Sequence, residues 1–314
     1  LPARKKQIEE YLTGKLLPFW LDRAIDKKNG GFITHFDKDG NDSGEDEKSL
    51  IAQTRTVYTF SSALRAGYGS ARSGASCAEA AAHGVDFLID KMWDKDNGGF
   101  YWTTDRKGNV AIDQKIIYGH SFAMYALAEY TLATGDGRGL EYAKKVFDLM
   151  QKYCADTMYG GYFEMFNNNW DLCGPGTAGG DRKTLDVHMH LMEAFTTLFE
   201  ASGEAIHRRK LQENITNLVT RIMHPEYGTG IPQFWEDWKV APQIKFDIVW
   251  GWDRFDDGGT KANADDNTSA GHNVEFAWLL WRALDVMEED WHPYLPLIKK
   301  QLDHEVANGI DYEY

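Results

Sequence analysis

Two segments of the sequence place ionisable side chains on one face of a predicted helix. In one of them, His272 and Glu275 are three residues apart, and an apolar run follows at once. Because residues at this spacing share a helical face, the carboxylate can orient the imidazole and raise its basicity. An imidazole that titrates near neutral pH is suited to proton transfer. An ordinary helix start with an acidic residue would show the same pattern, so both interpretations stay open.

A second predicted helix carries a similar group of side chains near its start. Asp186, His190 and Glu193 recur at helical spacing, and the rest of this helix is largely apolar, which favours burial. His188 lies about 200° around the helix from His190, so the two histidines need not face the same pocket. We expect ionisable groups of the two helices to converge on one pocket.

Other polar and aromatic residues could belong to such a pocket. Arg55 lies in the middle of a predicted helix, where it could hold a developing oxyanion or extend along the surface to solvent. Tyr118 and His120 begin another helix, whose dipole disfavours a charged imidazole. His120 is therefore either a neutral hydrogen-bonding group in the pocket or a structural histidine. Trp235 follows a glycine-rich turn and is either a platform for a sugar ring or a packed aromatic.

The sequence predicts neither a metal ion nor a nucleotide cofactor. His188, His190 and His272 could supply nitrogen ligands, but their spacing matches no helical zinc motif. None of the three cysteines forms a CxxC pair that would help to bind a metal. No Walker loop and no Rossmann fingerprint is present.

An internal repeat predicts the elements that position these residues. Asn29-Gly30-Gly31-Phe32 recurs as Asn97-Gly98-Gly99-Phe100 and Tyr159-Gly160-Gly161-Tyr162, and more loosely at 227–231. Each copy predicts a small hairpin. Helix pairs separated by short hairpins predict an all-α solenoid or closed toroid, here one domain over 1–314, and in a toroid the hairpins would line one rim. A polar, aperiodic segment, 251–268, predicts a long loop of the kind that often forms a functional lid. Helical periodicity covers 3–26, 45–66, 77–92, 118–134, 140–153, 184–201, 204–223, 272–287 and 291–306.

Charge and composition exclude some classes of partner. The net charge of −14 disfavours nucleic acid and anionic membrane surfaces. No apolar run reaches the length of a membrane span. The odd number of cysteines is typical of buried thiols in a reducing compartment, and we expect a cytoplasmic location. The 11 tryptophans are compatible with stacking on a sugar. The sequence does not predict an oligomeric state.

Taken together and in order, these segments resemble the N-acylglucosamine 2-epimerase superfamily, most closely its cellobiose 2-epimerase and mannose 2-epimerase branch. The resemblance extends over most of the chain. It rests on the Asn-Gly-Gly-Phe hairpins, Gln53-Thr54-Arg55, and the segments 118–127, 183–196 and 271–275.

The resemblance implies an (α/α)6 barrel that epimerises C2 of an unmodified reducing sugar, a mono- or disaccharide, through an enediolate and without a cofactor. In this family His272 would be one of two acid/base histidines, supported by Glu275. Arg55 would bind the oxygens of the reacting end, and His190 would assist in the pocket. Asp186 stands where the cellobiose 2-epimerase branch usually has Asn. The candidates for substrate binding are Tyr118, His120, Asp186, His188, Glu193 and Trp235.

The family's final segments, including the helix with the second catalytic histidine, have no match within 288–314. We therefore expect the barrel to lack its C-terminal helices. Other activities stay open at this point. They are an aldose–ketose isomerase, a glycoside hydrolase that uses two of the carboxylates, and a non-catalytic sugar-binding homologue.

Overall fold

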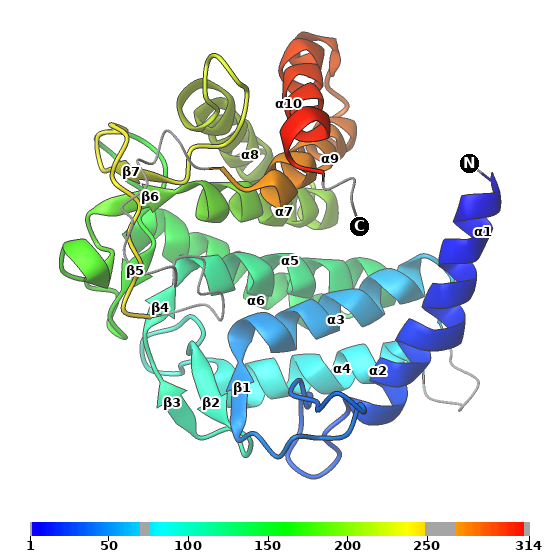
Figure 1. Ribbon diagram of the computed structural model, residues 1–314. Helices are drawn as coiled ribbons and strands as arrows, with labels where there is room; N and C mark the ends of the chain where they lie inside the picture. The colour runs from blue at the N-terminus through cyan, green and yellow to red at the C-terminus, as the bar shows by residue number, and fades with distance from the viewer. Residues whose placement is uncertain (1, 70–75, 249–267, 311–314) are drawn as a thin grey trace. The chain divides into compact units, whose positions relative to one another are not determined.

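The computed structural model describes residues 2–69, 76–248 and 268–310 (Figure 1). The chain is mostly helical and divides into two compact units. The first unit consists of Leu1–Lys115 and Phe122–Asp148, and the second of Ile116–Ser121 and Leu149–Tyr314. Each unit is described by itself, and the single continuous domain stays a prediction.

The first unit combines helices with a small antiparallel sheet. Its strands β1, β2 and β3 pair in that order, with Glu47 opposite Asp105 and Thr103 opposite Ile112. The helices α3 and α4 lie side by side (Figure 1). The elements are α1 (Pro2–Tyr11), α2 (Leu17–Arg23), β1 (Glu47–Ser49), α3 (Leu50–Arg65), α4 (Cys77–Phe87), β2 (Thr103–Asp105), β3 (Val110–Ile112), most of α5 (Ile117–Thr134) and α6 (Gly137–Leu149).

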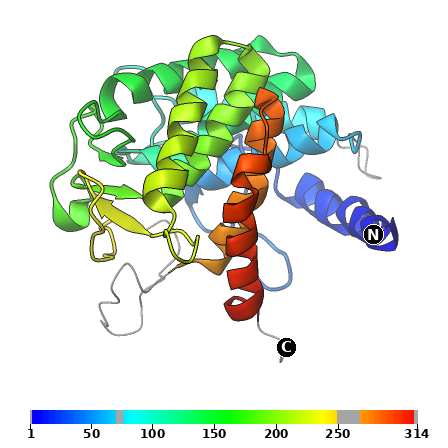
Figure 2. The same ribbon diagram turned by 90° about the horizontal axis from the view of Figure 1, so that it is seen from above.

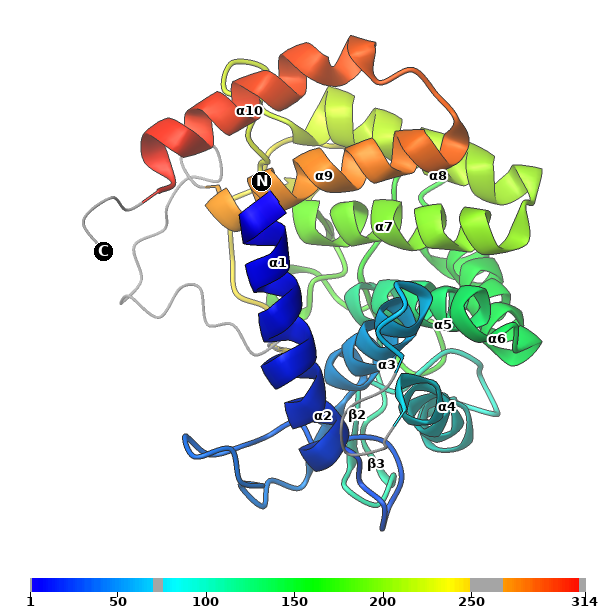
Figure 3. The ribbon, with the colours of Figure 1, turned by 90° about the vertical axis from the view of Figure 1, so that its right-hand side faces the viewer.

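The second unit holds the helices that carry most of the predicted site. The helix α9 lies between α7 and α10 (Figure 3), and α8 lies beside α7 (Figure 2). The unit also contains two short two-stranded sheets, in which β4 pairs with β5 and β6 pairs with β7. The elements are β4 (Lys115–Ile116), β5 (Met165–Phe166), β6 (Arg182–Thr184), α7 (Leu185–Ser202), α8 (Ala205–Asn217), β7 (Gln233–Trp235), α9 (Ala270–Met287) and α10 (Leu295–Asn308).

The predicted helices are present, with boundaries that local capping explains. The helix predicted over 45–66 begins only at Leu50, because Glu47–Ser49 is a strand and the Ser49 side chain caps the helix. Such a cap satisfies a backbone N–H that has no partner within the first turn. Side chains that cap a helix in this way are Ser49, Ser76, Thr184 and Ser269.

The predicted glycine-rich hairpins are also present, as tight loops closed by an antiparallel bridge. The bridges join Ile25 to Phe32, Trp93 to Phe100, Ala155 to Tyr162, and Met223 to Gly230. A helix that ends in a π-helical turn precedes each of the last three loops. Every loop thus leads from the end of one helix towards the start of the next.

Buried ion pairs, which the sequence analysis missed, fasten these loops to the following helix. Lys48 contacts Asp26 at 3.0 Å, Lys115 contacts Asp94 at 2.8 Å, and Lys183 contacts Asp156 at 2.6 Å. Each aspartate opens a glycine-rich loop, and each lysine lies two residues before the first residue of α3, α5 or α7. The even spacing of these lysines along the chain was the signal that could have revealed them.

The fourth copy of the loop replaces the ion pair with neutral groups. His224 occupies the position of the aspartate, and its Nδ1 accepts the backbone N–H groups of Glu226 and Tyr227 at 3.2 Å. Thr268 occupies the position of the lysine, and its hydroxyl donates to the Gly230 carbonyl at 2.9 Å. The geometry of the loop is therefore kept while the charges are lost.

We predict that Lys115→Met lowers the free energy of unfolding by about 3–5 kcal/mol, because Asp94 is then buried without its cation. Urea denaturation of the variant measures the loss. The double variant Lys115→Met/Asp94→Asn should recover more than half of it. Lys145→Met, which removes an exposed pair with Glu141, is the control and should change stability by about 0.5 kcal/mol or less. A loss below about 1 kcal/mol in Lys115→Met would contradict the prediction.

The same pair predicts a sensitivity to acid. Burial alone would raise the pKa of Asp94, but hydrogen bonds from Lys115 and from the backbone of Asn97 and Asp96 outweigh it and lower the pKa to about 2. A depressed folded-state pKa stabilises the fold above the ordinary value of 3.8, and this stabilisation is lost as the pH falls towards 2. Unfolding free energies measured between pH 5 and pH 2 should fall less steeply in the double variant than in the wild type.

Candidate active site

The start of α7 is fixed from two sides. The Lys183 ammonium lies directly before the helix and is held by Asp156 and by the carbonyls of Gly160 (2.8 Å) and Glu236 (2.6 Å). The Thr184 hydroxyl accepts the N–H of Val187 at 3.3 Å and so caps the helix. The first turn of α7 is thereby held in one position, and the helix is buried from Val187 to Leu198.

The start of α9 brings a histidine to the first turn of α7. The Ser269 hydroxyl accepts the N–H of His272 at 3.4 Å and caps α9, which packs along α7 (Figure 3). The His272 Nδ1 then lies 3.3 Å from the Asp186 Oδ1. Both side chains are largely buried, with 11% and 19% of their surface exposed. A carboxylate at this distance stabilises the imidazolium that forms when the ring takes a proton.

A second pair of the same kind lies beside the first. His190 is buried, and its Nδ1 lies 3.2 Å from the Glu193 Oε2, one turn further along α7. The rings of His190 and His272 are 6.0 Å apart between centroids and inclined by 75°. Tyr118 presents its edge to His190 at 5.2 Å. The predicted convergence of the two helices on one cluster is therefore observed.

Glu275 completes this cluster, and its predicted support of His272 stays a prediction. His190, His272 and Glu275 each place one potential ligand atom within 4.8 Å of the others. We expected Glu275 to orient His272, yet the carboxylate in ion-pair contact with the His272 Nδ1 belongs to Asp186 on the neighbouring helix. The sequence could not reveal that partner because the contact depends on how α7 and α9 pack.

His188 has a structural environment that differs from the substrate-binding role predicted for it. Its Nδ1 is 2.8 Å from the Thr184 carbonyl, and its Nε2 accepts the backbone N–H of Tyr162 at 3.1 Å. Burial lowers the pKa of His188 to about 4, although the hydrogen bond to Thr184 opposes this, so the ring is neutral near pH 7. His188 therefore holds the loop of Gly160 and Gly161 against α7.

Equivalent positions of the other repeats use different side chains for this purpose. Gln53 accepts the N–H of Phe32 at 2.7 Å, and Asn273 accepts the N–H of Gly230 at 2.8 Å. His120 occupies the same position in α5, where it is fully buried and its Nδ1 is 2.8 Å from the Ile116 carbonyl. The structural interpretation of His120 is thus favoured, and its role in binding substrate stays a prediction.

The remaining predicted residues lie apart from the histidine cluster or in the other unit. Trp235 is on β7, where the Arg182 guanidinium covers its ring at 4.3 Å. Arg55 belongs to the first unit, and its guanidinium lies 4.2 Å from the centre of the Phe122 ring. Their roles toward a sugar stay predictions. The loop predicted over 251–268 lies outside the described residues apart from Thr268.

A buried acid near Asp186 was missed by the sequence analysis. Glu164 is fully buried, and its Oε2 accepts the Thr184 hydroxyl at 2.8 Å. Burial raises the pKa of Glu164 to about 8, the hydrogen bond from Thr184 opposes the shift, and the charge of Asp186 adds to it. Glu164 is therefore a neutral acid near pH 7.

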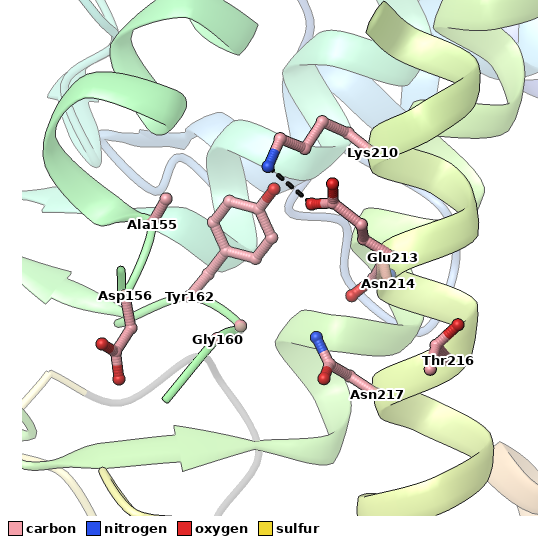
Figure 4. A pocket seen from close by; sticks show the side chains of 10 residues that line it. Ala155, Asp156, Gly160, Tyr162, Lys210, Glu213, Asn214, Thr216 and Asn217 are labelled. Carbon is pink, nitrogen blue, oxygen red and sulfur yellow. Dashed lines mark hydrogen bonds and ion pairs between the residues drawn. The ribbon is translucent and has the colours of Figure 1, made fainter. Parts of the chain in front are cut away.

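The second unit also contains a separate pocket of about 290 Å³ (Figure 4). It lies between α8 and the loop that follows α6, and an ion pair of Lys210 and Glu213 at 2.5 Å crosses one side of it. None of the predicted site residues lines this pocket. The candidate active site is therefore defined by the histidine cluster.

Comparisons with known proteins agree with these observations. Residues 31–314 match the family model described as N-acylglucosamine 2-epimerase (GlcNAc 2-epimerase). The solved structure of cellobiose 2-epimerase from Spirochaeta thermophila is 27% identical with a TM-score of 0.81, and the match covers 98% of this chain and 70% of that one. By this similarity the chain has the predicted (α/α)6-barrel fold.

Curated relatives define the class of protein. Cellobiose 2-epimerase of Bacteroides fragilis is 29% identical over 294 residues, which are 90% of this chain and 66% of that protein. Mannose-6-phosphate isomerase of Rhizobium meliloti is 27% identical over 283 residues, which are 88% of this chain and 62% of that protein. The chain thus spans about two thirds of the length of these relatives, whose names describe carbohydrate isomerases and epimerases.

The family match places the chain among proteins whose names describe carbohydrate isomerases and epimerases. Within that class, the chain belongs to the N-acylglucosamine 2-epimerase family, as the sequence predicted. Among the described helices, none is both long enough and apolar enough to cross a membrane.

We predict that His188→Ala lowers the free energy of unfolding by about 2–3 kcal/mol, because the N–H of Tyr162 is left buried without an acceptor. His188→Gln should recover part of this loss, since Gln53 accepts the corresponding N–H in the first repeat. Urea denaturation compares both variants with His292→Ala, which removes an exposed histidine. If His188→Ala is as stable as the wild type, the structural role is wrong.

Proposed function

We propose that the protein is a sugar 2-epimerase that acts on a reducing-end aldose of the cellobiose, mannobiose or mannose type. The observation that carries the proposal is the pair of adjacent histidines, His190 and His272, each with a carboxylate beside its Nδ1. The names of the relatives, cellobiose 2-epimerase in particular, support the reaction and the substrate class.

The proposed chemistry begins with an open-chain aldose, whose C2 hydrogen is acidic because it lies next to the aldehyde. His272 removes this proton as a general base and leaves an enediolate. Arg55 is the candidate to stabilise the charge that develops on O1 or O2. A proton returned to the opposite face of C2 inverts that carbon and closes the cycle without any net gain or loss of atoms.

Inversion requires either two acid/base groups or one group and an intermediate that turns. His190 is the described residue best placed to be the second group, because its ring lies next to His272 and has its own carboxylate. A further histidine supplied by the family's C-terminal segment is the other candidate. Tyr118 and Glu193 contact His190 directly and so belong to the proposed pocket.

Asp186 acts in this proposal through His272. The Asp186 carboxylate lies 3.3 Å from the His272 Nδ1 and favours the ring orientation in which Nε2 faces away from it to take the C2 proton. It also stabilises the resulting imidazolium by its charge, which the amide usual at this position in the cellobiose 2-epimerase branch could not do. Asp186 is thus a positioning residue rather than a group that binds the sugar.

The reaction can be tested by incubating the protein with cellobiose, mannobiose, mannose or N-acetylglucosamine in D2O and following the products by NMR. We expect the C2 epimer with deuterium at C2, because a proton held by a histidine exchanges with solvent. Epimerisation without incorporation of deuterium would contradict the proposal. Release of monosaccharides from the disaccharides would show a glycoside hydrolase instead.

An aldose–ketose isomerase is the second candidate, favoured by the mannose-6-phosphate isomerase among the relatives. Such an enzyme forms the same enediolate but returns the proton to C1. The same experiment distinguishes the two, since mannose would then give fructose with deuterium at C1. Formation of both products would show that the proton returns to either carbon.

We predict that His272→Asn lowers the rate of C2 exchange at least about 100-fold, since it removes the general base. The measurement is the initial rate of deuterium incorporation at saturating sugar. Circular dichroism of the variant controls for folding. A variant that exchanges C2 within a few-fold of the wild-type rate would remove His272 from the mechanism.

We also predict that Asp186→Asn lowers kcat about tenfold with little change in KM. The amide keeps the size of the side chain, but it brings no charge to stabilise the imidazolium. The matched control is Glu200→Gln on the same helix, whose partner is Arg282 at 3.0 Å. If KM rises while kcat is kept, Asp186 binds the sugar instead.

A further inference from the structure

We propose that His190, His272 and Glu275 form a binding site for a divalent transition-metal ion of the Zn²⁺ type, and that such an ion inhibits the protein. The inhibition rests on the proposed function, whereas the binding of the ion does not. The site is defined by donors from two packed helices, α7 and α9, so no motif within either helix could reveal it. This proposal differs from the sequence analysis, which predicted no metal ion because the spacing of the histidines matches no zinc motif.

The set of donors is the first argument. Two imidazoles and one carboxylate are a common ligand set of zinc sites that keep a position open. The three donor atoms here lie within 4.8 Å of one another. Donors bound tetrahedrally at zinc distances lie roughly 3.4 Å apart, so small side-chain rotations would close the cluster on an ion.

The groups behind the histidines are the second argument. A histidine that binds a metal usually has a carboxylate or carbonyl at its other ring nitrogen, which fixes the ring and strengthens the ligand. Glu193 occupies this position for His190 at 3.2 Å, and Asp186 does so for His272 at 3.3 Å. In both rings Nδ1 is the nitrogen toward the carboxylate, so Nε2 lies on the opposite edge of the ring.

Charge and burial are the third argument. The carboxylates of Asp186, Glu193 and Glu275 together offset the two charges of a divalent ion. His190 is buried and His272 is largely buried. The packing of the two helices therefore fixes the positions of these donors, and little water competes for them. A bound ion would occupy the nitrogen lone pairs that the proposed reaction needs to remove the C2 proton. Inhibition is therefore the expected consequence.

The binding is tested on protein freed of metal by dialysis against EDTA. Co²⁺ is added as a spectroscopic probe, and Zn²⁺ binding is measured by isothermal titration calorimetry. We expect one ion per chain with a Kd below about 10 μM and the strong visible absorption of tetrahedral Co²⁺. His190→Asn, His272→Asn and Glu275→Gln should each weaken binding at least about tenfold.

The control variant is His292→Asn, because His292 and Asp290 form an exposed pair at 2.6 Å that could bind ions adventitiously. Affinity and absorption should be unchanged in this variant. Binding that is lost in His292→Asn but kept in the three cluster variants would overturn the proposal. Circular dichroism of each variant excludes loss of folding as the cause of weak binding.

The inhibition is tested separately by measuring sugar turnover at increasing Zn²⁺. Activity should fall in proportion to the occupancy measured by calorimetry, and EDTA should restore it. Activation by Zn²⁺ would overturn the inhibitory role. Turnover without any cluster-dependent binding would overturn the metal site and leave the epimerase intact. Binding that follows the cluster variants in a protein that turns over no sugar would support the site and contradict the proposed function alone.

Discussion

The candidate site depends on the buried ion pair of Lys183 and Asp156. A lysine without exposed surface is costly unless its charge is matched, and Lys183 is matched by one carboxylate and two backbone carbonyls. These partners belong to two different loops, so the pair fixes both loops and the start of α7 at one point. A shift of α7 by one residue would turn Asp186 and His190 away from α9.

The repeat shows how a structural position can resemble a catalytic one. Gln53, His120, His188 and Asn273 occupy the same place in four successive repeats, and Gln53, His188 and Asn273 each accept a backbone N–H of a glycine-rich loop. A residue that takes part in the proposed reaction must face the neighbouring helix instead of a loop. His190 satisfies this condition because it lies two residues beyond His188, roughly 200° around the helix.

The sequence was sufficient for features set by local geometry. Helical periodicity and glycine pairs predicted the helices and the loops, and they also predicted which ionisable residues share a face of one helix. It was not sufficient for contacts set by packing. The Asp186–His272 pair joins two helices that are far apart in the chain, and the role of His188 depends on a loop 26 residues away. Residue type alone could not separate His188 from His190.

Glu164, the buried acid near Asp186, keeps its proton near pH 7. Two nearby carboxyl groups of unequal burial do not ionise alike, and the more buried one retains its proton. Thr184 donates to Glu164 and caps α7, so the same hydroxyl group positions the neutral acid and the helix that carries Asp186. Because the pKa of Glu164 is raised to about 8 from 4.5, the folded state holds a proton that the unfolded chain releases. Stability therefore declines as the pH rises through this interval, because the unfolded chain gives up the proton that the buried acid retains.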